Sequence, residues 1–399
     1  MPYAELTESI IDKLVPLDGH ALKVQQLRCA KVRNRHVECL RCAEACTSGA
    51  IAVADGHLEV EVAKCVGCGT CATVCPTGAL EARNPVDAEL AGECARSAVA
   101  GEVVFMCSQA AEALSGIVEE GRIAKVVCAG RIDETLLASL AARGTGHIDV
   151  VCGRCEACEQ RHGLATAELV AETARTLFRA WGADVELQVG SAPPERALAF
   201  GHTLKEAREA LDRHFASQVA CPPVNTDDDL ARMAEARKAR ESESGGTFAK
   251  EMHVMADGTL AHFVPERRER LLEHLSTLGE PRNVTLDVRL WGKVTIDMSK
   301  CESCLMCATF CPTGALQKFT DDDDRFGVVH RPEMCVKCRS CENICHAGAI
   351  TVSDEVGARE LADGTSERHY MAPRPVALET PTQMADTYSR LAGIPIRDF

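Results

Sequence analysis

Runs of cysteine at fixed intervals constrain this chain more than any other feature. The stretches CESCLMCATFCPTGAL (301–316) and CVKCRSCENICHAGAI (335–350) share one spacing of four cysteines, which recurs in CVGCGTCATVCPTGAL (65–80). A fourth stretch, CLRCAEACTSGAI (39–51), keeps only the last three cysteines of the pattern. Two-residue gaps in a tight loop bring successive sulfurs to one side, which suits metal binding. The two pairs of runs therefore indicate an internal duplication.

Composition favours metal over disulfides. The chain has 399 residues, of which 23 are cysteine, and it is 46% hydrophobic and 26% charged. A chain of this length can form several domains with cores of their own, so it does not need disulfides for want of a core. Structural zinc is disfavoured too, because zinc sites use two paired C-x2-C hooks rather than a run of three cysteines plus a fourth.

The charge and the N-terminal sequence disfavour several classes of function. The formal net charge is −15, and no basic stripe with interleaved aromatic residues occurs, so nucleic acid is a poor candidate partner. The stretch MPYAELTESIIDKLVPLDGH lacks the basic start and apolar core of a signal peptide, and no segment approaches the roughly 20 apolar residues of a membrane span. We therefore expect a cytoplasmic protein without a transmembrane segment, whose thiolates stay free to bind metal.

Residues about 25–85 and 290–355 each resemble a bacterial two-cluster ferredoxin. The resemblance rests on the C-x2-C-x2-C-x3-C-P pattern, which is complete at 65–76 and 301–312. In such ferredoxins the last cysteine of each run binds the cluster of the other run. The resemblance implies four 4Fe-4S clusters with the following ligand sets: Cys301, Cys304, Cys307 and Cys345; Cys335, Cys338, Cys341 and Cys311; Cys65, Cys68, Cys71 and Cys46; Cys39, Cys42, Cys75 and Cys29.

The last of these sets departs from the family pattern. Cys29 stands ten positions before Cys39, where the pattern has its first cysteine only three positions earlier. If Cys29 does not reach the site, a three-iron cluster or another ligand would take its place. Cys46 and Cys345 also lack the proline that often follows the last cysteine of a run, which leaves the sulfurs in place.

The region from about 100 to 200 has a different pattern. Short apolar runs, GEVVFMC, RIAKVVC, HIDVVC and DVELQVG, alternate with helical stretches, which predicts a parallel sheet with helices on its faces. Cys107, Cys128 and Cys152 close three of these strands, and the carboxyl ends of parallel strands share one edge, where ligand sites gather. Cys158 can fold back onto that edge, so the sequence predicts a metal site there.

The runs FMCS, VVCAGRIDETLLASLAARG and VVCGRCEACEQRHG resemble the iron–sulfur delta subunit of methyl-viologen-reducing hydrogenases. That subunit passes electrons between a dehydrogenase partner and heterodisulfide-reductase-type flavoproteins. The resemblance implies one 2Fe-2S cluster, whose ligands are Cys107, Cys128, Cys152 and Cys158. Cys155 is an addition relative to that family and widens the gap between the last two ligands. Cys94, Cys155 and Cys221 then bind no cluster.

In a second interpretation, VVCGRCEACEQRHG is a ferredoxin-type loop whose fourth position is His162. It would hold a 4Fe-4S cluster through these residues: Cys152, Cys155, Cys158 and either Cys107 or Cys128. Both interpretations remain open at the level of the sequence.

The sequence thus predicts α+β ferredoxin-like domains at both ends, a central α/β domain with a parallel sheet, and a helical connector. The connector rests on charged, helix-forming stretches such as LKEAREALDRHF, and the polar, proline-rich end of the chain is interpreted as an extended tail. The predicted boundaries are 1–90 for the N-terminal ferredoxin-like domain, 91–200 for the central domain, 201–285 for the connector, 286–356 for the C-terminal ferredoxin-like domain and 357–399 for the tail.

Five clusters in one chain indicate a path for electrons, because closely spaced one-electron centres let electrons cross a protein in short steps. No G-x-G-x-x-G, P-loop, G-x-S-x-G or H-E-x-x-H motif occurs, and we predict no catalytic residue. The favoured function is an electron-transfer subunit of an anaerobic oxidoreductase complex. It would connect a catalytic dehydrogenase (hydrogenase, formate dehydrogenase or aldehyde oxidoreductase type) to a flavoprotein or heterodisulfide-reductase-like subunit, with soluble ferredoxin as a further candidate partner. The alternatives are an iron–sulfur enzyme with a substrate site at the central cluster, and a redox sensor.

Overall fold

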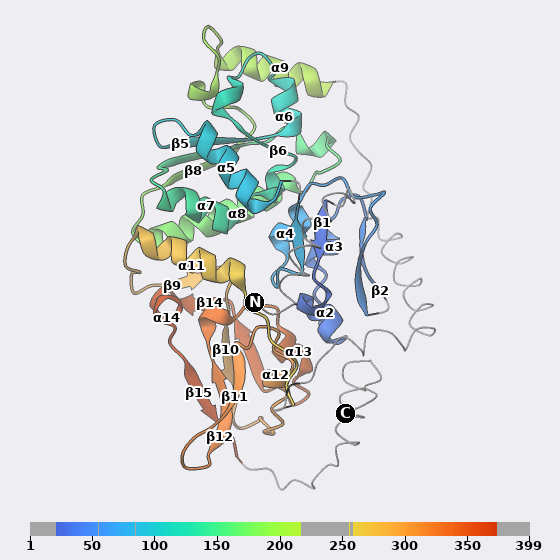
Figure 1. Cartoon of the computed structure of the whole chain (residues 1–399), viewed down its shortest axis with the longest axis vertical. Coiled ribbons are helices and arrows are strands. Elements are labelled where there is room, and N and C mark those ends of the chain that lie inside the picture. The colour runs from blue at the N-terminus through green and yellow to red at the C-terminus, as the bar shows by residue number, and fades with distance from the viewer. Residues whose placement is uncertain (1–20, 55, 84, 217–254, 256–257, 373–399) are drawn as a thin grey trace, which may run out of the picture.

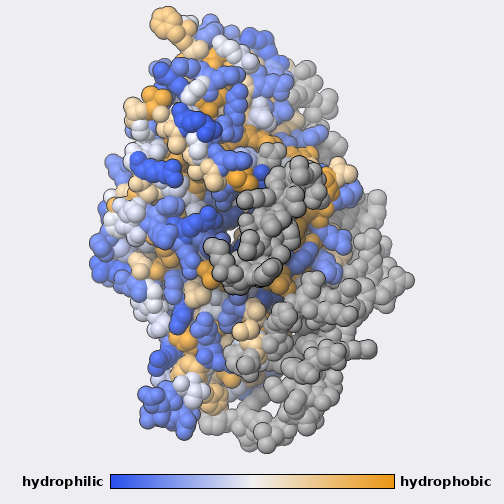
Figure 2. Space-filling view, in the orientation of Figure 1, coloured by the Kyte–Doolittle hydropathy of each residue, from blue (hydrophilic) through white to orange (hydrophobic). Residues whose placement is uncertain are grey.

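The computed structural model describes residues 21–54, 56–83, 85–216, 255 and 258–372, which form three regions (Figure 1). In the view of Figure 1 the central region lies at the top, the N-terminal region at the right and the C-terminal region at the bottom. Hydrophilic residues cover most of the described surface on the face shown in Figure 2, with smaller apolar patches between them. No helix formed by the described residues is long and apolar enough to span a membrane.

The N-terminal region consists of short strands and helices around its cysteines. Strand β1 (Leu22–Val24) pairs with β4 (Leu80–Ala82), and β2 (Ile51–Ala54) forms a hairpin with β3 (His57–Val60), all antiparallel. The helices are α2 (Ala30–Arg33), α3 (Arg41–Ala45) and α4 (Thr70–Val74). The hairpin therefore lies between the two cysteine runs, and the outer pair encloses both of them.

The predicted parallel sheet of the central region is confirmed. Its order is β6-β5-β7-β8, with every pair parallel. The strands are β5 (Glu102–Cys107), β6 (Ala124–Val126), β7 (His147–Val151) and β8 (Glu186–Gly190). The helices around them are α5 (Asp87–Ser97), α6 (Ser108–Ala113), α7 (Glu134–Ala142), α8 (Gly163–Ala180) and α9 (Leu204–Ala216).

Both faces of this sheet are buried, as alternation along β5 illustrates. Val103 and Phe105 belong to a core shared with α5, α7 and α8, whereas Val104 and Met106 belong to a core shared with α6 and α9. Helix α9, predicted as the start of a connector, thus covers the sheet with its apolar side. Helix α11 (Glu266–Leu278) likewise packs on α7 through the first core. Most of the predicted connector between them, including Cys221, lies outside the described residues.

The C-terminal region repeats the arrangement of the N-terminal one and extends it. Strand β10 (Lys293–Ile296) pairs with β13 (Ile350–Ser353), and a hairpin of β11 (Leu316–Thr320) and β12 (Phe326–His330) lies between the cysteine runs. A further pair joins β9 (Thr285–Asp287) to β14 (Glu355–Gly357). The helices are α12 (Met306–Thr309), α13 (Ser340–Ile344) and α14 (Ala358–Asp363).

The prediction of an extended tail from residue 357 is wrong for its first part. Residues 358–363 form α14, which buries Ala358 and Leu361, and β15 (Glu367–Tyr370) adds a third strand beside β12. The sequence ERHY of β15 lacks the apolar alternation by which a strand is predicted. The strand lies at a sheet edge, so backbone pairing rather than burial of side chains holds it in place. Residues 373–399 lie outside the described part of the chain.

Candidate metal centres

One cysteine group of the C-terminal region surrounds a small cavity. Cys301, Cys304 and Cys307 line it from the first run, and Cys345 lines it from the second. Burial, and then the charges of neighbouring cysteines, raise the pKa of Cys307 to about 12. The backbone N–H of Ala349 donates to Sγ of Cys345 at 3.3 Å. The structure therefore brings together the crossed set that the resemblance implies.

The second C-terminal group is more deeply buried. Burial, and then the charges of Cys335, Cys338 and Cys311, raise the pKa of Cys341 well above its usual value. Cys311, the last cysteine of the first run, accepts a hydrogen bond from the backbone N–H of Leu316 at 3.4 Å. These four cysteines again combine three from one run with one from the other.

In the N-terminal region the regular run forms one group. Burial, and then the charges of Cys68, Cys46 and Cys65, with a further contribution from Cys42 of the adjoining group, raise the pKa of Cys71 well above its usual value. Cys46 closes α3, the helix that carries the irregular run, so this set is crossed as well.

The remaining N-terminal group includes Cys29. Burial raises the pKa of Cys29 to about 11, with contributions from the charges of Cys75 and Cys39. Burial, and then the charges of Cys75, Cys29 and Cys39, raise the pKa of Cys42. The gap of ten residues is shortened because α2 and the turn after it fold the intervening segment into a compact loop. The structure thus brings Cys29 to the set in which the sequence places it.

The three regular runs share an unusual backbone. The residues on either side of the second cysteine have φ between 52° and 75°, in the left-handed region. These residues are glycines in the N-terminal run and larger residues in both C-terminal runs: Gly67 and Gly69, Ser303 and Leu305, Lys337 and Arg339. In the irregular run, Leu40 has φ −129° instead. The tight loop around the second cysteine is therefore a feature of the complete pattern.

The central sheet gathers cysteines at one edge, as the sequence predicts. Cys107 ends β5, Cys152 directly follows β7 and Cys128 lies two residues after β6. A small cavity at this edge is lined by five cysteines: Cys107, Cys128, Cys152, Cys155 and Cys158. A Cβ at position 163, where the chain has glycine, would collide with the sulfur of Cys128. This glycine lets the first turn of α8 approach the site.

Within this edge Cys155 and Cys152 are joined by a hydrogen bond between their side chains. A hydrogen bond from Cys152, the largest effect, lowers the pKa of Cys155 to about 7. Burial raises the pKa of Cys128 to about 12, and the charges of Cys107 and Cys155 contribute. Cys158 instead donates to Oε1 of Gln160 at 3.1 Å. The C-x2-C-x2-C spacing of this loop already contained the signal that Cys155 is a candidate ligand.

Two other residues considered from the sequence lie apart from this edge. His162 does not line the cavity, and its Nδ1 lies 3.3 Å from the carbonyl oxygen of Ala45. Cys94 is fully buried on α5 in the core of the central region. His162 therefore lies at a contact between the central and N-terminal regions, and Cys94 is a core cysteine.

Neighbouring cysteine groups are close to one another across the borders of the three regions. The charge of Cys68 contributes to the raised pKa of Cys128, after burial, and the charge of Cys39 contributes in the same way at Cys338. At the border between the N-terminal and central regions, the residue after Cys68 packs directly on Arg131. Position 69 is glycine, and a Cβ there would collide with the Arg131 side chain. The contact joins α4 to the 3-10 turn Ala129–Arg131, which follows Cys128.

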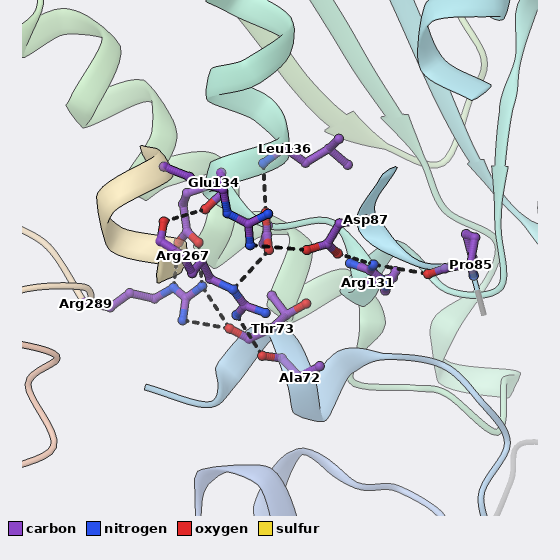
Figure 3. A network of polar contacts seen from close by, with 12 residues as sticks. Ala72, Thr73, Pro85, Asp87, Arg131, Glu134, Leu136, Arg267 and Arg289 are labelled. Carbon is purple, nitrogen blue, oxygen red and sulfur yellow. Dashed lines mark hydrogen bonds and ion pairs between the residues drawn. The ribbon is translucent and has the colours of Figure 1, made fainter. Parts of the chain in front are cut away.

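A network of arginines and carboxylates holds these loops (Figure 3). The guanidinium of Arg289 donates to both carboxylate oxygens of Glu134 at 2.7 Å and to the carbonyl oxygen of Thr73 at 3.3 Å. Arg267 donates to the carbonyl oxygen of Ala72 at 2.8 Å. The carbonyls at the end of a helix lack partners within the helix, so these arginines satisfy the end of α4. Helix α4 carries Cys71 and is thereby tied to α11 and, through Arg289 and Glu134, to α7 of the central region.

The donor chemistry of these groups fits iron–sulfur clusters. Four buried thiols raise one another's pKa, so the protein alone does not favour four thiolates, and a cationic metal centre would stabilise them. Among the described residues, no three histidine, cysteine or acidic side chains lie close enough to hold one metal ion. A cube, whose thiolates bind four separate irons, spreads its ligands more widely than a single ion does.

Comparison with known proteins supports this chemistry. A model of the 4Fe-4S binding domain family matches residues 58–81 and 294–317. An iron–sulfur protein of Rhodospirillum rubrum is 35% identical over 89 residues, which are 22% of this chain and 42% of that protein. The electron transport protein HydN of Escherichia coli is 39% identical over 62 residues, 16% of this chain and 35% of HydN. The chain thus spans less than half the length of these two relatives.

A third relative is covered almost completely. An uncharacterized ferredoxin of Methanocaldococcus jannaschii is 39% identical over 64 residues, which are 16% of this chain and 97% of that ferredoxin. No solved structure matches the chain. The chain therefore belongs to the ferredoxin family, with 4Fe-4S binding domains in both its N-terminal and its C-terminal region.

Proposed function

We propose that the chain is an electron-transfer subunit in which five iron–sulfur clusters form one row. Four cysteine groups would each hold a 4Fe-4S cluster, and the fifth cluster would lie at the edge of the central sheet. The proposed ligand sets are Cys65, Cys68, Cys71 and Cys46; Cys29, Cys39, Cys42 and Cys75; Cys335, Cys338, Cys341 and Cys311; and Cys301, Cys304, Cys307 and Cys345. The clusters would supply one-electron chemistry, and the protein would set their potentials by burial and hydrogen bonds to sulfur.

The observation that carries the proposal is that each group has a close neighbour in the next group. Starting from the central site, the neighbouring pairs are Cys128 and Cys68, Cys71 and Cys42, Cys338 and Cys39, and Cys341 and Cys307. We propose that these contacts form a single row, with the central site and the group around Cys301 as its ends. Electrons entering at one end would reach the other in four short steps.

We infer that the two ends serve different redox partners. The resemblance of the central segments to the delta subunit of methyl-viologen-reducing hydrogenases favours a catalytic dehydrogenase and a heterodisulfide-reductase-like flavoprotein as these partners. The name of HydN, an electron transport protein, agrees with transfer rather than catalysis. At the central site we propose a 2Fe-2S cluster on Cys107, Cys128 and Cys152, with a fourth ligand from the loop that follows β7.

The first test counts the clusters. Anaerobically purified full-length protein should contain about 18 iron atoms per chain, for four cubes and one two-iron centre. Dithionite reduction should add a 2Fe-2S EPR signal that Cys128→Ser removes. About 20 iron atoms with cube signals alone would make the central site a fifth cube, and about 16 would overturn a cluster there.

The second test asks whether the row conducts. Freeze-quench EPR after mixing with a limiting amount of reduced methyl viologen should show all clusters approaching a common equilibrium. Cys42→Ser, which removes a cluster from the middle of the row, should separate the two ends so that they equilibrate much more slowly. Unchanged equilibration in that variant, with the middle cluster confirmed absent, would overturn the row.

A further inference from the structure

Within the part of the chain that the structure describes, an arginine at the border between the N-terminal and C-terminal regions lacks a hydrogen-bond partner for two of its three guanidinium nitrogens. Arg33, at the end of α2, is 4% exposed. Its Nη1 donates to the carbonyl oxygen of Leu27 at 3.1 Å. Among the described residues, neither its Nε nor its Nη2 finds a hydrogen-bond acceptor, although both are buried. A buried donor without an acceptor is rare and calls for a partner.

The border itself is well packed, so Arg33 is held in place. Val32 shares a hydrophobic core with Phe310 and Ile344 of the C-terminal region. Phe310 directly precedes Cys311, and Ile344 ends α13, the helix that carries Cys341. The side chain next to Val32 is therefore enclosed where the two ferredoxin-like regions meet.

The charge of Arg33 requires an anion nearby. A guanidinium stays protonated in proteins, and burying an unpaired charge is costly. Burial lowers the pKa of Arg33, and the charges of Cys311 and Cys338 oppose that shift. Both cysteines belong to the same proposed cluster site, which is the first of the C-terminal region along the row. A cluster with four thiolates is a strong anionic acceptor for the free N–H groups.

We propose that Arg33 tunes the cluster held by Cys311, Cys335, Cys338 and Cys341, by donating hydrogen bonds to its sulfurs and placing a positive charge beside it. This inference rests on the proposed function. Added positive charge and hydrogen bonds to sulfur both favour the reduced form of a cluster and so raise its reduction potential. Arg33 comes from the other ferredoxin-like region, so correct docking of the two regions would set the potential at their border.

The test is an EPR-monitored redox titration of the full-length protein. Arg33→Gln should shift one cube signal to lower potential, so that at the wild-type midpoint the ratio of oxidised to reduced cluster rises at least tenfold, which is about 59 mV for one electron. Arg33→Lys should keep part of the effect because it keeps the charge. Cys338→Ser identifies the signal, since changing a ligand alters the spectrum of its own cluster.

Arg35→Gln is the matched control, because it removes the same charge from an exposed position two residues away. Its titration should equal the wild type. Unchanged midpoints in Arg33→Gln at full iron content would overturn the inference, whereas absence of cube signals in the wild type would overturn the proposed function instead. A purely structural role for Arg33 would leave the midpoint of the assembled cluster unmoved.

A measurement on the wild-type fold covers the case in which Arg33→Gln fails to assemble. Protein labelled with ¹⁵N-arginine and partly reduced should show a ¹⁵N coupling to a cube in pulsed EPR. The coupling should disappear in Arg33→Lys. A labelled wild-type protein without any arginine coupling to a reduced cube would contradict the hydrogen bonds.

Discussion

The two ferredoxin-like regions share a topology but assemble their cysteines differently. Each has an outer antiparallel strand pair and an inner hairpin between two runs. In the C-terminal region both runs use the left-handed backbone around their second cysteine, whereas the N-terminal region uses it in one run and recruits Cys29 from the start of α2 in the other. Two different local structures therefore bring four cysteines together in the two regions.

The regular runs also differ in how they tolerate this backbone. Glycine adopts the left-handed conformation freely, but other residues are destabilised in it by about 1–2 kcal/mol. In the second C-terminal run the side chains compensate: Lys337 donates to the carbonyl oxygen of Val288 at 2.8 Å, and Arg339 pairs with Glu342 and Asp354. In this run the strained residues are also the ones whose side chains tie the loop to its surroundings.

The largest expected effect compares Cys29, the distant cysteine that completes the irregular run, with Cys301, the first cysteine of a regular run. Cys29→Ser and Cys301→Ser should each disrupt one cube, with a loss of up to about four iron atoms or conversion to a three-iron centre. Iron analysis and EPR measure this. Cys94→Ser, a core cysteine outside every group, is the control and should retain all iron. Full iron and unchanged spectra in Cys29→Ser would show that the irregular run is completed by another ligand.

The central site gives a second contrast, between two cysteines of one loop. We expect Cys155→Ser to abolish or alter the central cluster signal, because Cys155 lies beside Cys152, whereas Cys158→Ser should leave it intact. EPR of the dithionite-reduced variants decides. The reverse result would restore Cys158 as the ligand that the resemblance implies.

The polar network should matter more to stability than any surface ion pair. Glu134→Gln leaves the charge of Arg289 buried and partly unpaired, which we expect to destabilise the protein by about 3 kcal/mol. Glu360→Gln, which breaks the more exposed pair with Lys293, should cost less than about 1 kcal/mol. Denaturant unfolding of the two variants measures the difference. Equal losses would show that the network does not hold the regions together.

A pH effect is expected from a buried histidine of the C-terminal region. Burial lowers the pKa of His330 to about 4, against about 6.5 for an exposed histidine. The unfolded chain binds a proton at this residue between these values and the folded chain does not, so stability should fall by up to about 3 kcal/mol as the pH drops from 6.5 to 4. Unfolding of His330→Leu should depend less on pH over this range than that of the wild type.

The smallest effect exchanges the residues at one equivalent position of two runs. Ser303 and Gly67 both precede the second cysteine with φ near 60°. Ser303→Gly should stabilise the C-terminal region by up to about 1 kcal/mol, and Gly67→Ser should destabilise the N-terminal region by a similar amount. Rates of heat-induced bleaching of the cluster absorbance report both. Shifts in the same direction would contradict the role of the backbone.

Much of the fold and of the candidate sites could be predicted because the signals are local. Four cysteines in a loop of eleven residues, or a strand ending in cysteine, specify their geometry within a few neighbours. The position of β15 could not be predicted, because an edge strand without apolar alternation resembles a loop in sequence. Nor could the burial of α9 on the sheet, since a few apolar residues among charged ones also fit a solvated connector.

The sequence by itself predicted crossed cysteine sets for the paired runs of the ferredoxin-like regions, and it determined that the central strands run parallel, because spacing and alternation are properties of short segments. Only the tertiary structure decided that Cys29 reaches its group, that Cys155 is hydrogen-bonded to Cys152, and that Cys68 and Cys39 approach groups of other regions. These contacts depend on how separate regions pack through shared cores and buried ion pairs. No short segment encodes that packing alone.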